Sequence, residues 1–344
     1  MGSMHNPTRT HEWTQVLSAL PWIHVVIALI SALCSASVIT CVTSRRLGGA
    51  TSELRALFQL AVSDLLLALC GLLGGALLVW HAGALAWYRL HAARQVVCMA
   101  SFFYTLNYMW NVYARLRLNF WCVPHQLPAQ ISKRAIPTTN MTALLSGVIP
   151  PLLMAPVFIQ PRVGSCAGNC SDAYRCLLMP VGVLPVTAEQ PIRTCRLLLG
   201  YCGAVFLAAF ALTLVGMMVL MGKSRQVYRR VVTSRGYLGN QQRVSFRALD
   251  LRMLAYFLSF ALCWGPTASL VALRATRSSS DVEGVSTAVL YVTQAITSAS
   301  PGILHFAALA CGRGPPGRTL AWRDANTQTP LLRAQKRPTR TYTS

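Results

Sequence analysis

Charged side chains are scarce in this chain of 344 residues, and acidic ones are scarcer still. Only 12% of the residues are charged, and 9 are Asp or Glu against 31 Lys or Arg. A soluble domain carries about 25% charged residues, so this sequence cannot cover a water-facing surface. The net charge of +22 would favour a nucleic-acid partner in a soluble protein. Here the basic residues stand between apolar runs, so we expect contact with membrane lipid and no nucleic acid.

Several groups that catalysis would need are also missing. No HExxH or GxSxG sequence occurs, and the apolar runs contain one carboxylate where intramembrane aspartyl chemistry needs two. His81 and His91 lie ten residues apart with no further metal ligand nearby. The last apolar run has no Lys, which excludes a retinal Schiff base. We therefore expect no enzyme, no metal and no cofactor.

Seven apolar runs are long enough to cross a membrane, since a spanning helix needs about 20 mostly apolar residues. They cover 17–43, 54–80, 95–118, 137–159, 195–222, 253–273 and 286–310. The third is aromatic and polar and the last is rich in Ser and Thr, so these two are the weakest. We predict an all-α membrane protein with a seven-helix bundle like that of G-protein-coupled receptors. An outer tail would occupy 1–16, the membrane domain 17–310 and a largely disordered cytoplasmic tail 311–344.

The distribution of basic residues predicts the orientation. With the N-terminus outside, 22 of the 31 Lys and Arg fall on the inner side, where such residues accumulate. Residues 1–16 lack the basic and apolar regions of a cleaved signal peptide, so the first span would act as its own insertion signal. We expect a multi-pass protein of the plasma membrane with a cytoplasmic C-terminus.

Polar residues inside the spans are candidates for a functional site. Asp64 is the only acidic residue within any predicted span, and a carboxylate there is costly and usually functional. We predict a central polar hub, the alternative being a protonated Asp bonded to Ser or Asn on neighbouring helices. On the third span, Tyr104, Asn107, Tyr108 and Asn111 recur at i, i+3, i+4 and i+7 and share one face. This face would line a cavity for an unknown extracellular ligand, or join helices by hydrogen bonds.

Several stretches from the fourth span onward resemble one family. They are VIPPLLMAPVF, YRCLLMP, GYLGNQQ, CWGP, LYVTQAIT and the tail run RDANTQTPLLRAQKR, which no membrane requirement dictates. The chain resembles the transmembrane protein 116 family, seven-helix relatives of orphan and cyclic-AMP-receptor-like receptors. CMASFFYTLNYMWNVYARL in the third span is also similar to the cyclic-AMP-like pattern. The resemblance implies a receptor fold and coupling to a heterotrimeric G protein.

The receptor resemblance implies roles for particular residues. A Cys at the outer end of the third span ties the long outer loop to that helix in such receptors, so Cys98 is expected to form a disulfide. Cys176 is the first choice of partner, and Cys166, Cys170 and Cys195 stay open. Trp264 and Pro266 match a CWxP element that allows the inner half of a helix to swing, although a kink without switching is as reasonable.

The sequence also departs from the common receptor pattern. The seventh span has Ser300 and Pro301 but lacks the Asn and Tyr of NPxxY, and no acidic residue precedes Arg115 or Arg117 to make a DRY element. These departures argue against an ordinary rhodopsin-like receptor. His305 is a further departure from the relatives.

The inner connections suggest where a cytoplasmic partner would dock. The segment 223–252 is the most basic connection between spans, and the docking candidates are Arg117, Lys223, Arg225, Arg229 and Arg230. The alternative is that these charges only set topology and contact anionic lipid. Asn169 starts a glycosylation sequon on the outer side, whereas the sequon at Asn140 falls on the inner side. The leading hypothesis is an orphan receptor-like signal transducer, against a membrane scaffold or a small-solute transporter.

The predicted orientation can be tested with an epitope tag at each end of the chain. We expect an N-terminal tag to be stained on intact cells and a C-terminal tag only after permeabilisation, because of the 22-to-9 bias of Lys and Arg. Staining of the C-terminal tag on intact cells would exclude the seven-span topology.

Overall fold

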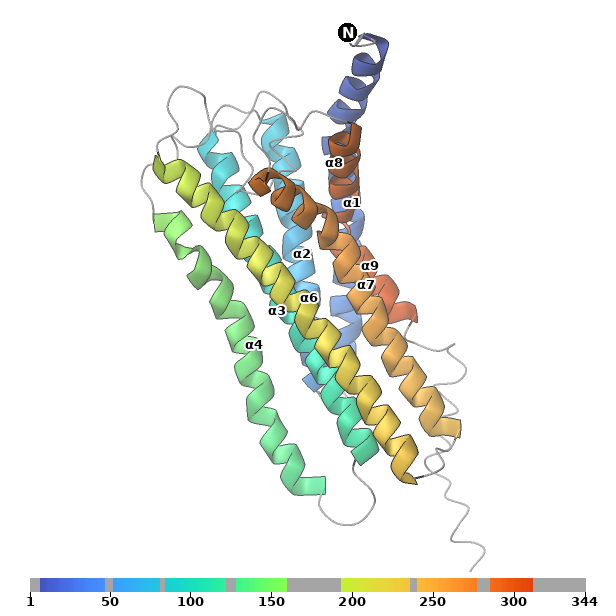
Figure 1. The fold of residues 1–344 in the computed structure, drawn as a ribbon. Helices are drawn as coiled ribbons and strands as arrows, with labels where there is room; N and C mark the ends of the chain where they lie inside the picture. Colours follow the sequence, from blue (N-terminus) through green and yellow to red (C-terminus); the bar gives the residue numbers. More distant parts are fainter. Residues whose placement is uncertain are drawn as a thin grey trace, which may run out of the picture.

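The computed structural model of the chain describes residues 7–46, 52–80, 84–121, 128–159, 193–235, 240–276 and 285–311. These residues form eight α-helices arranged as one bundle (Figure 1). The helices are α1 (Pro7–Arg46), α2 (Ser52–Val79), α3 (Ala84–Trp121), α4 (Pro128–Ile159), α6 (Arg193–Arg235), α7 (Asn240–Thr276), α8 (Val285–Thr297) and α9 (Pro301–Cys311). Helices are the expected response to apolar sequence, because a helix satisfies its own backbone hydrogen bonds in lipid.

The packing of the helices places α3 at the centre and brings the first and last described helices together. Helix α3 packs against α2, α4, α6 and α7, whereas α4 lies at one side of the bundle (Figure 1). Helix α1 packs against α2, α8 and α9, so the first and last helices meet. We call the end where α1, α3 and α6 finish and α2, α4 and α7 begin the basic end.

Four helices contain stretches that are long and apolar enough to span a membrane. They are Ala19–Ser44, Ser52–Val79, Gly200–Thr233 and Phe246–Leu273. The count of seven spans is therefore not confirmed. The third helix carries several polar side chains, the part of α4 whose side chains are described gives the shorter apolar stretch Leu144–Ile159, and the last predicted span is divided into α8 and α9. All the regular secondary structure among the described residues is helical.

The helices extend beyond the predicted spans. Helix α1 begins at Pro7 rather than at residue 17, and α3 begins at Ala84 rather than at 95. Helix α6 has 43 residues, roughly twice the length needed to cross the hydrocarbon core. Most of the basic connection 223–252 is thus helical, with α6 continuing to Arg235 and α7 starting at Asn240.

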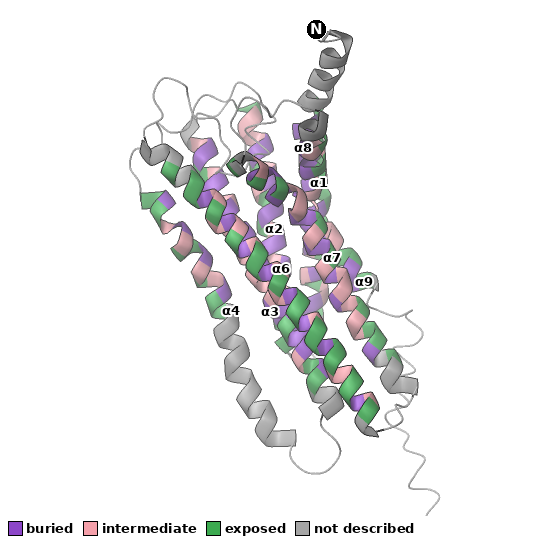
Figure 2. Ribbon diagram, viewed as in Figure 1, coloured by how far each residue is buried: buried purple, intermediate pink, exposed green. Residues whose placement is uncertain are grey.

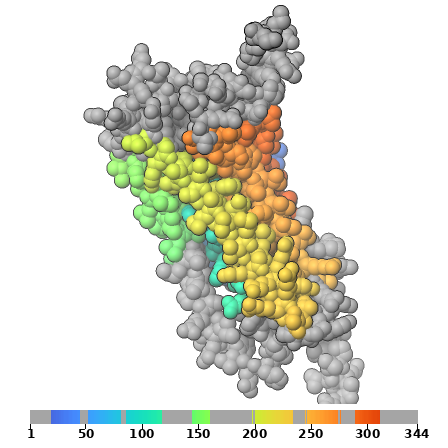
Figure 3. Space-filling model, viewed as in Figure 1, coloured from blue at the N-terminus to red at the C-terminus, as the bar shows by residue number. Residues whose placement is uncertain are grey.

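Apolar side chains point both into the bundle and away from it. The interior holds an aromatic group in which Phe102 contacts Phe206, Phe260 and Trp264. Large apolar residues such as Leu73 and Leu212 are exposed, and Figure 2 shows exposed positions recurring along α6 at the front of the bundle. Figure 3 shows α6 and α7 side by side on the same face. An exposed apolar surface of this kind suits contact with lipid.

A second, smaller hydrophobic cluster holds the basic end together. It is formed by Leu116 of α3, Val231 of α6 and Phe246 of α7. The ring of Tyr228 stacks on Phe246 with centroids 4.1 Å apart. The extensions of α6 and α7 are therefore packed against each other and against α3.

One glycine is required for the close approach of α9 to α1. A Cβ on Gly302 would lie 2.5 Å from the backbone carbonyl oxygen of Ser31 and 2.8 Å from the Oγ of Ser31. The Gly302 N–H donates to that Oγ over 3.0 Å. Gly222 of α6, in contrast, has open space around it.

Replacing these two glycines by alanine should give opposite results. Gly302→Ala should cost about 1–3 kcal/mol through overpacking, whereas Gly222→Ala should be neutral or slightly stabilising because Ala favours a helix over Gly. Thermal unfolding of the purified full chain in detergent measures both. Equal melting temperatures for the two variants would contradict the observed contact of α9 with α1.

Candidate functional site

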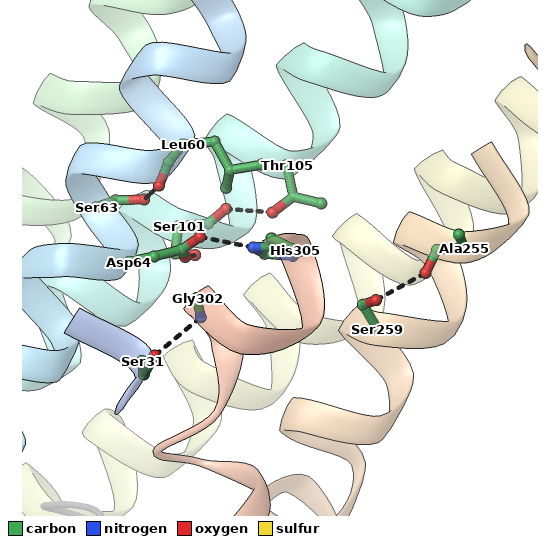
Figure 4. Close-up of polar contacts among 10 residues, drawn as sticks. All are labelled: Ser31, Leu60, Ser63, Asp64, Ser101, Thr105, Ala255, Ser259, Gly302 and His305. Atoms are coloured by element: carbon green, nitrogen blue, oxygen red, sulfur yellow. Dashed lines mark hydrogen bonds and ion pairs between the residues drawn. The ribbon is translucent and has the colours of Figure 1, made fainter. Parts of the chain in front are cut away.

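The side chain of Asp64 lies at the meeting point of α2, α3 and α9. It is buried, with 2% of the residue exposed, and it contacts two side chains (Figure 4). His305 Nδ1 is 2.6 Å from Asp64 Oδ2, and Ser101 Oγ donates to Asp64 Oδ1 over 3.3 Å. The residue that the sequence marks as a departure from the relatives is thus the partner of the only carboxylate in a predicted span.

The break between α8 and α9 positions His305. The Ser300 carbonyl accepts the first bond of α9, from Leu304 N over 3.0 Å, and Pro301 occupies the first helical position. Proline suits that position because its missing N–H would have no helical partner there. Helix α9 then lies against α1 through Gly302, and His305, one turn later, faces Asp64 (Figure 4).

Charge neutrality constrains the Asp64–His305 pair. A lone buried carboxylate in lipid is expensive, and a pair is tolerated when the partner's hydrogen bonds compensate the lost water. His305 lies against one oxygen of the carboxylate and Ser101 donates to the other. The ring of Tyr256 stacks on His305 with centroids 5.3 Å apart, so the pair also contacts α7.

A second buried carboxylate lies at the basic end. Glu53, the second residue of α2, accepts hydrogen bonds from Arg115 of α3 and Arg252 of α7. The Arg252 Nη1 to Glu53 Oε1 distance is 2.6 Å, and Arg115 Nη1 contacts the other oxygen. We call these three residues the Glu53 bridge. It joins three helices, and it supplies the carboxylate near Arg115 that the sequence lacks beside it.

Aromatic side chains connect the two polar groups. Tyr256 of α7 lies between His305 and Tyr108 of α3, with a centroid distance of 4.5 Å to Tyr108. Arg252 precedes Tyr256 by one helical turn on the same helix. The contacts Asp64–His305–Tyr256–Tyr108 therefore lead from the middle of the bundle towards the Glu53 bridge. Glu53 and Arg252 were not among the site residues that the sequence indicated.

Among known protein families, the family model described as transmembrane protein 116 matches residues 17–344. The chain belongs to the transmembrane protein 116 family. The match starts where we predicted the membrane domain to start and includes the tail, so the resemblance seen in the sequence is confirmed. With several apolar helices, this member of the family is a membrane protein.

The structure distributes the predicted cavity residues of this family member over different contacts. Tyr104 is half-buried beside Gly147 of α4. Its OH lies 2.9 Å from the position that a Cβ on Gly147 would occupy. Asn111 Nδ2 donates to the Asn107 carbonyl and to Asn107 Oδ1, over 2.8 and 3.2 Å. Tyr108 packs on Tyr256. The ligand cavity stays a prediction. In the described ranges, no three His, Cys, Asp or Glu side chains converge to hold a metal.

The structure does not show the predicted disulfide at Cys98. Cys98 is a buried free thiol, and its predicted partner Cys176 lies outside the described residues. The reason is depth, because α3 begins at Ala84 and places Cys98 about 21 Å along the helix at about 1.5 Å per residue. Cys98 therefore lies inside the bundle rather than at its outer end.

Arg94, which directly precedes the third predicted span, has its side chain within the bundle. Its side chain is partly buried, and Nη2 donates to Ser298 Oγ over 3.2 Å, in the break between α8 and α9. A long basic side chain at this depth can reach a polar break in a neighbouring helix, which charge counting along the sequence does not detect. The break thus receives a polar contact from the central helix.

The remaining predicted residues lie on α3, α6 and α7. Trp264 is buried against Phe102 with ring centroids 5.1 Å apart, and α7 continues through Pro266. The docking candidates are exposed at the basic end, on α3 and on the extension of α6: Arg117, Lys223, Arg225, Arg229 and Arg230. Arg225 Nε is 3.8 Å from Asp250 Oδ1. The predicted glycan acceptor Asn169 lies outside the described residues.

The Asp64–His305 pair predicts non-additive effects of mutation. His305→Leu should destabilise the chain by about 3–5 kcal/mol because it leaves Asp64 without its imidazole partner, and Asp64→Leu/His305→Leu should recover most of that loss. Denaturant or thermal unfolding of the purified variants gives the cycle. Simple addition of the two single effects would show that the contact contributes nothing as a pair.

Proposed function

We propose that the protein is a seven-helix, receptor-like signal transducer of the plasma membrane. Its N-terminus would lie outside, with a glycan at Asn169, and its basic end and C-terminal tail in the cytoplasm. An extracellular ligand would act on the outer half of the bundle. The partner at the basic end would be a heterotrimeric G protein, which the receptor resemblance favours. Membership of the transmembrane protein 116 family and the apolar helices support the membrane part of this proposal.

The observation that carries the proposal is the buried polar pair of Asp64 and His305. Ionisable groups in spans are expensive and are retained mainly where they serve a function. This pair joins α2 to α9 directly and reaches α7 through the stacked ring of Tyr256. A rearrangement at the pair would therefore act on α7, the helix that also holds one arginine of the Glu53 bridge.

A switch requires an element with two arrangements, and α7 has suitable features. Pro266, ten residues before the end of α7, removes a backbone hydrogen bond and so weakens the helix locally. The inner part of α7 is held to α3 and α2 by the Glu53 bridge, a polar contact that can break and re-form. An outside signal would shift the population between bridged and open arrangements.

A small-solute transporter is the second candidate, and the break between α8 and α9 favours it. Transporters bind substrate at discontinuous helices near the middle of the membrane. Here the break carries Ser298 and Ser300, receives Arg94 and lies one turn from His305. Transporters of that kind commonly contain a matching break in a second half. None of the other described helices is interrupted within a predicted span, so the receptor remains our proposal.

The receptor proposal predicts that Asp64→Asn changes signalling while leaving delivery to the cell surface near normal. The amide keeps the shape but removes the ionisable group, and coupling between sites commonly amounts to about fivefold or more. G-protein activation in transfected cells, at matched surface levels, is the measurement. Ser63→Ala is the control, because the neighbouring Ser63 hydroxyl donates only to Leu60 O of its own helix.

Two results would contradict the proposal. If Asp64→Asn signals like the wild type while Ser63→Ala does too, the Asp64 pair has a packing role only. If the wild-type chain activates no G-protein class at normal surface levels, a non-signalling membrane scaffold replaces the receptor.

A further inference from the structure

The Glu53 bridge contains more positive than negative charge. Two guanidinium groups, from Arg115 and Arg252, contact the two oxygens of one carboxylate. The site as a whole keeps one unit of positive charge. A partly buried cation in excess is costly unless an anion is near, so the site is complementary to one further carboxylate.

The bridge is accessible from one direction only. The Glu53 and Arg252 side chains are 9% and 17% exposed, whereas 55% of the Arg115 side chain is exposed. Arg115 lies on the central helix, six residues before α3 ends at the basic end. A group that binds Arg115 from that end would enter between α2, α3 and α7.

The surroundings of the bridge would attract an acidic group. The exposed side chains described at the basic end include Arg117 on α3 and Lys223, Arg229 and Arg230 on α6. The other carboxylate described at this end, that of Asp250, lies beside Arg225. A surface of one sign raises the encounter rate with partners of the opposite sign.

We propose that Arg115 and Arg252 form a docking site for an acidic segment of a cytoplasmic protein partner, and that Glu53 occupies this site in the free chain. The inference rests on the proposed function, in which the basic end meets such a partner. An incoming carboxylate takes the place of Glu53 on Arg115 through paired N–H donors, the geometry that guanidinium groups favour. Once Glu53 has also left Arg252, the Glu53 bridge no longer ties α7 to α2 and α3.

A protein segment fits the site better than a lipid headgroup. Headgroups surround the perimeter of the bundle, whereas the Glu53 bridge lies between the central helix and two neighbours. The exposed arginines of the α6 extension are open to lipid phosphates, but the Glu53 and Arg252 side chains are almost covered. Anionic lipid is therefore the competing outcome in the test.

The test measures binding of a fluorescein-labelled hexaglutamate peptide to the purified full chain in phosphatidylcholine nanodiscs, by fluorescence anisotropy. Glu53→Gln should tighten binding by about tenfold, because the internal competitor no longer fills the site. Arg115→Gln or Arg252→Gln added to Glu53→Gln should abolish that gain. Asp250→Asn is the matched control, since it raises the net charge equally without releasing Arg115 or Arg252, and it should leave affinity nearly unchanged.

Several outcomes would overturn the proposal. Equal tightening by Asp250→Asn and Glu53→Gln would mean that only overall charge matters. If Arg115→Gln leaves the affinity for the peptide unchanged, the arginines do not form the docking site. The same conclusion follows if Arg115 and Arg252 affect only the binding of phosphatidylserine in the nanodisc and not the binding of the peptide. If Glu53→Gln does not fold, Arg115→Gln in the otherwise native chain must weaken peptide binding more than Arg117→Gln does. No signalling enters this measurement, so its failure is distinguishable from failure of the proposed function.

Discussion

The need to neutralise a carboxylate inside an apolar bundle governs the arrangement of the last two helices. Asp64 cannot reach water, so its oxygens must be satisfied by side chains from other helices. His305 meets that need only if α9 lies close to α1 and α2, and that approach requires a glycine at position 302. The interruption at Ser298–Ser300, the proline that follows it and the closure of the bundle by α1 and α9 all serve the same contact.

Two polar levels separated by aromatic packing give the bundle its internal connection. Above the tyrosine pair lie Asp64 and His305, and below it lies the Glu53 bridge. Tyr256 contacts both His305 and Tyr108, so packed rings join the two levels. Helix α7 carries Tyr256 and Arg252, and Pro266 follows both of them, ten residues before the helix ends. It is therefore the helix on which both polar levels act.

The sequence predicted the elements better than their contacts. Long apolar runs determine helices, and a mid-span carboxylate is costly wherever its partner lies, so both the helical bundle and the importance of Asp64 were accessible. His305 is 241 residues from Asp64 and Arg252 is 199 residues from Glu53, and no local periodicity links such pairs. A search of the predicted spans for a histidine partner of Asp64 would have left two candidates, His24 and His305. The depth of Cys98 was lost because helices continue past the apolar core, where hydropathy no longer marks their ends.

The position of Glu53 changes the meaning of a missing sequence pattern. The absence of an acidic residue beside Arg115 argued against an ordinary receptor, yet a carboxylate reaches Arg115 from 62 residues away. A pattern of adjacent residues tests one route to an ion pair, whereas the physical requirement is only that opposite charges meet at the end of the bundle. In this arrangement the carboxylate is on α2 and is shared with α7. Movement of either arginine therefore leaves the other still paired, so the bridge can open in two steps rather than in one.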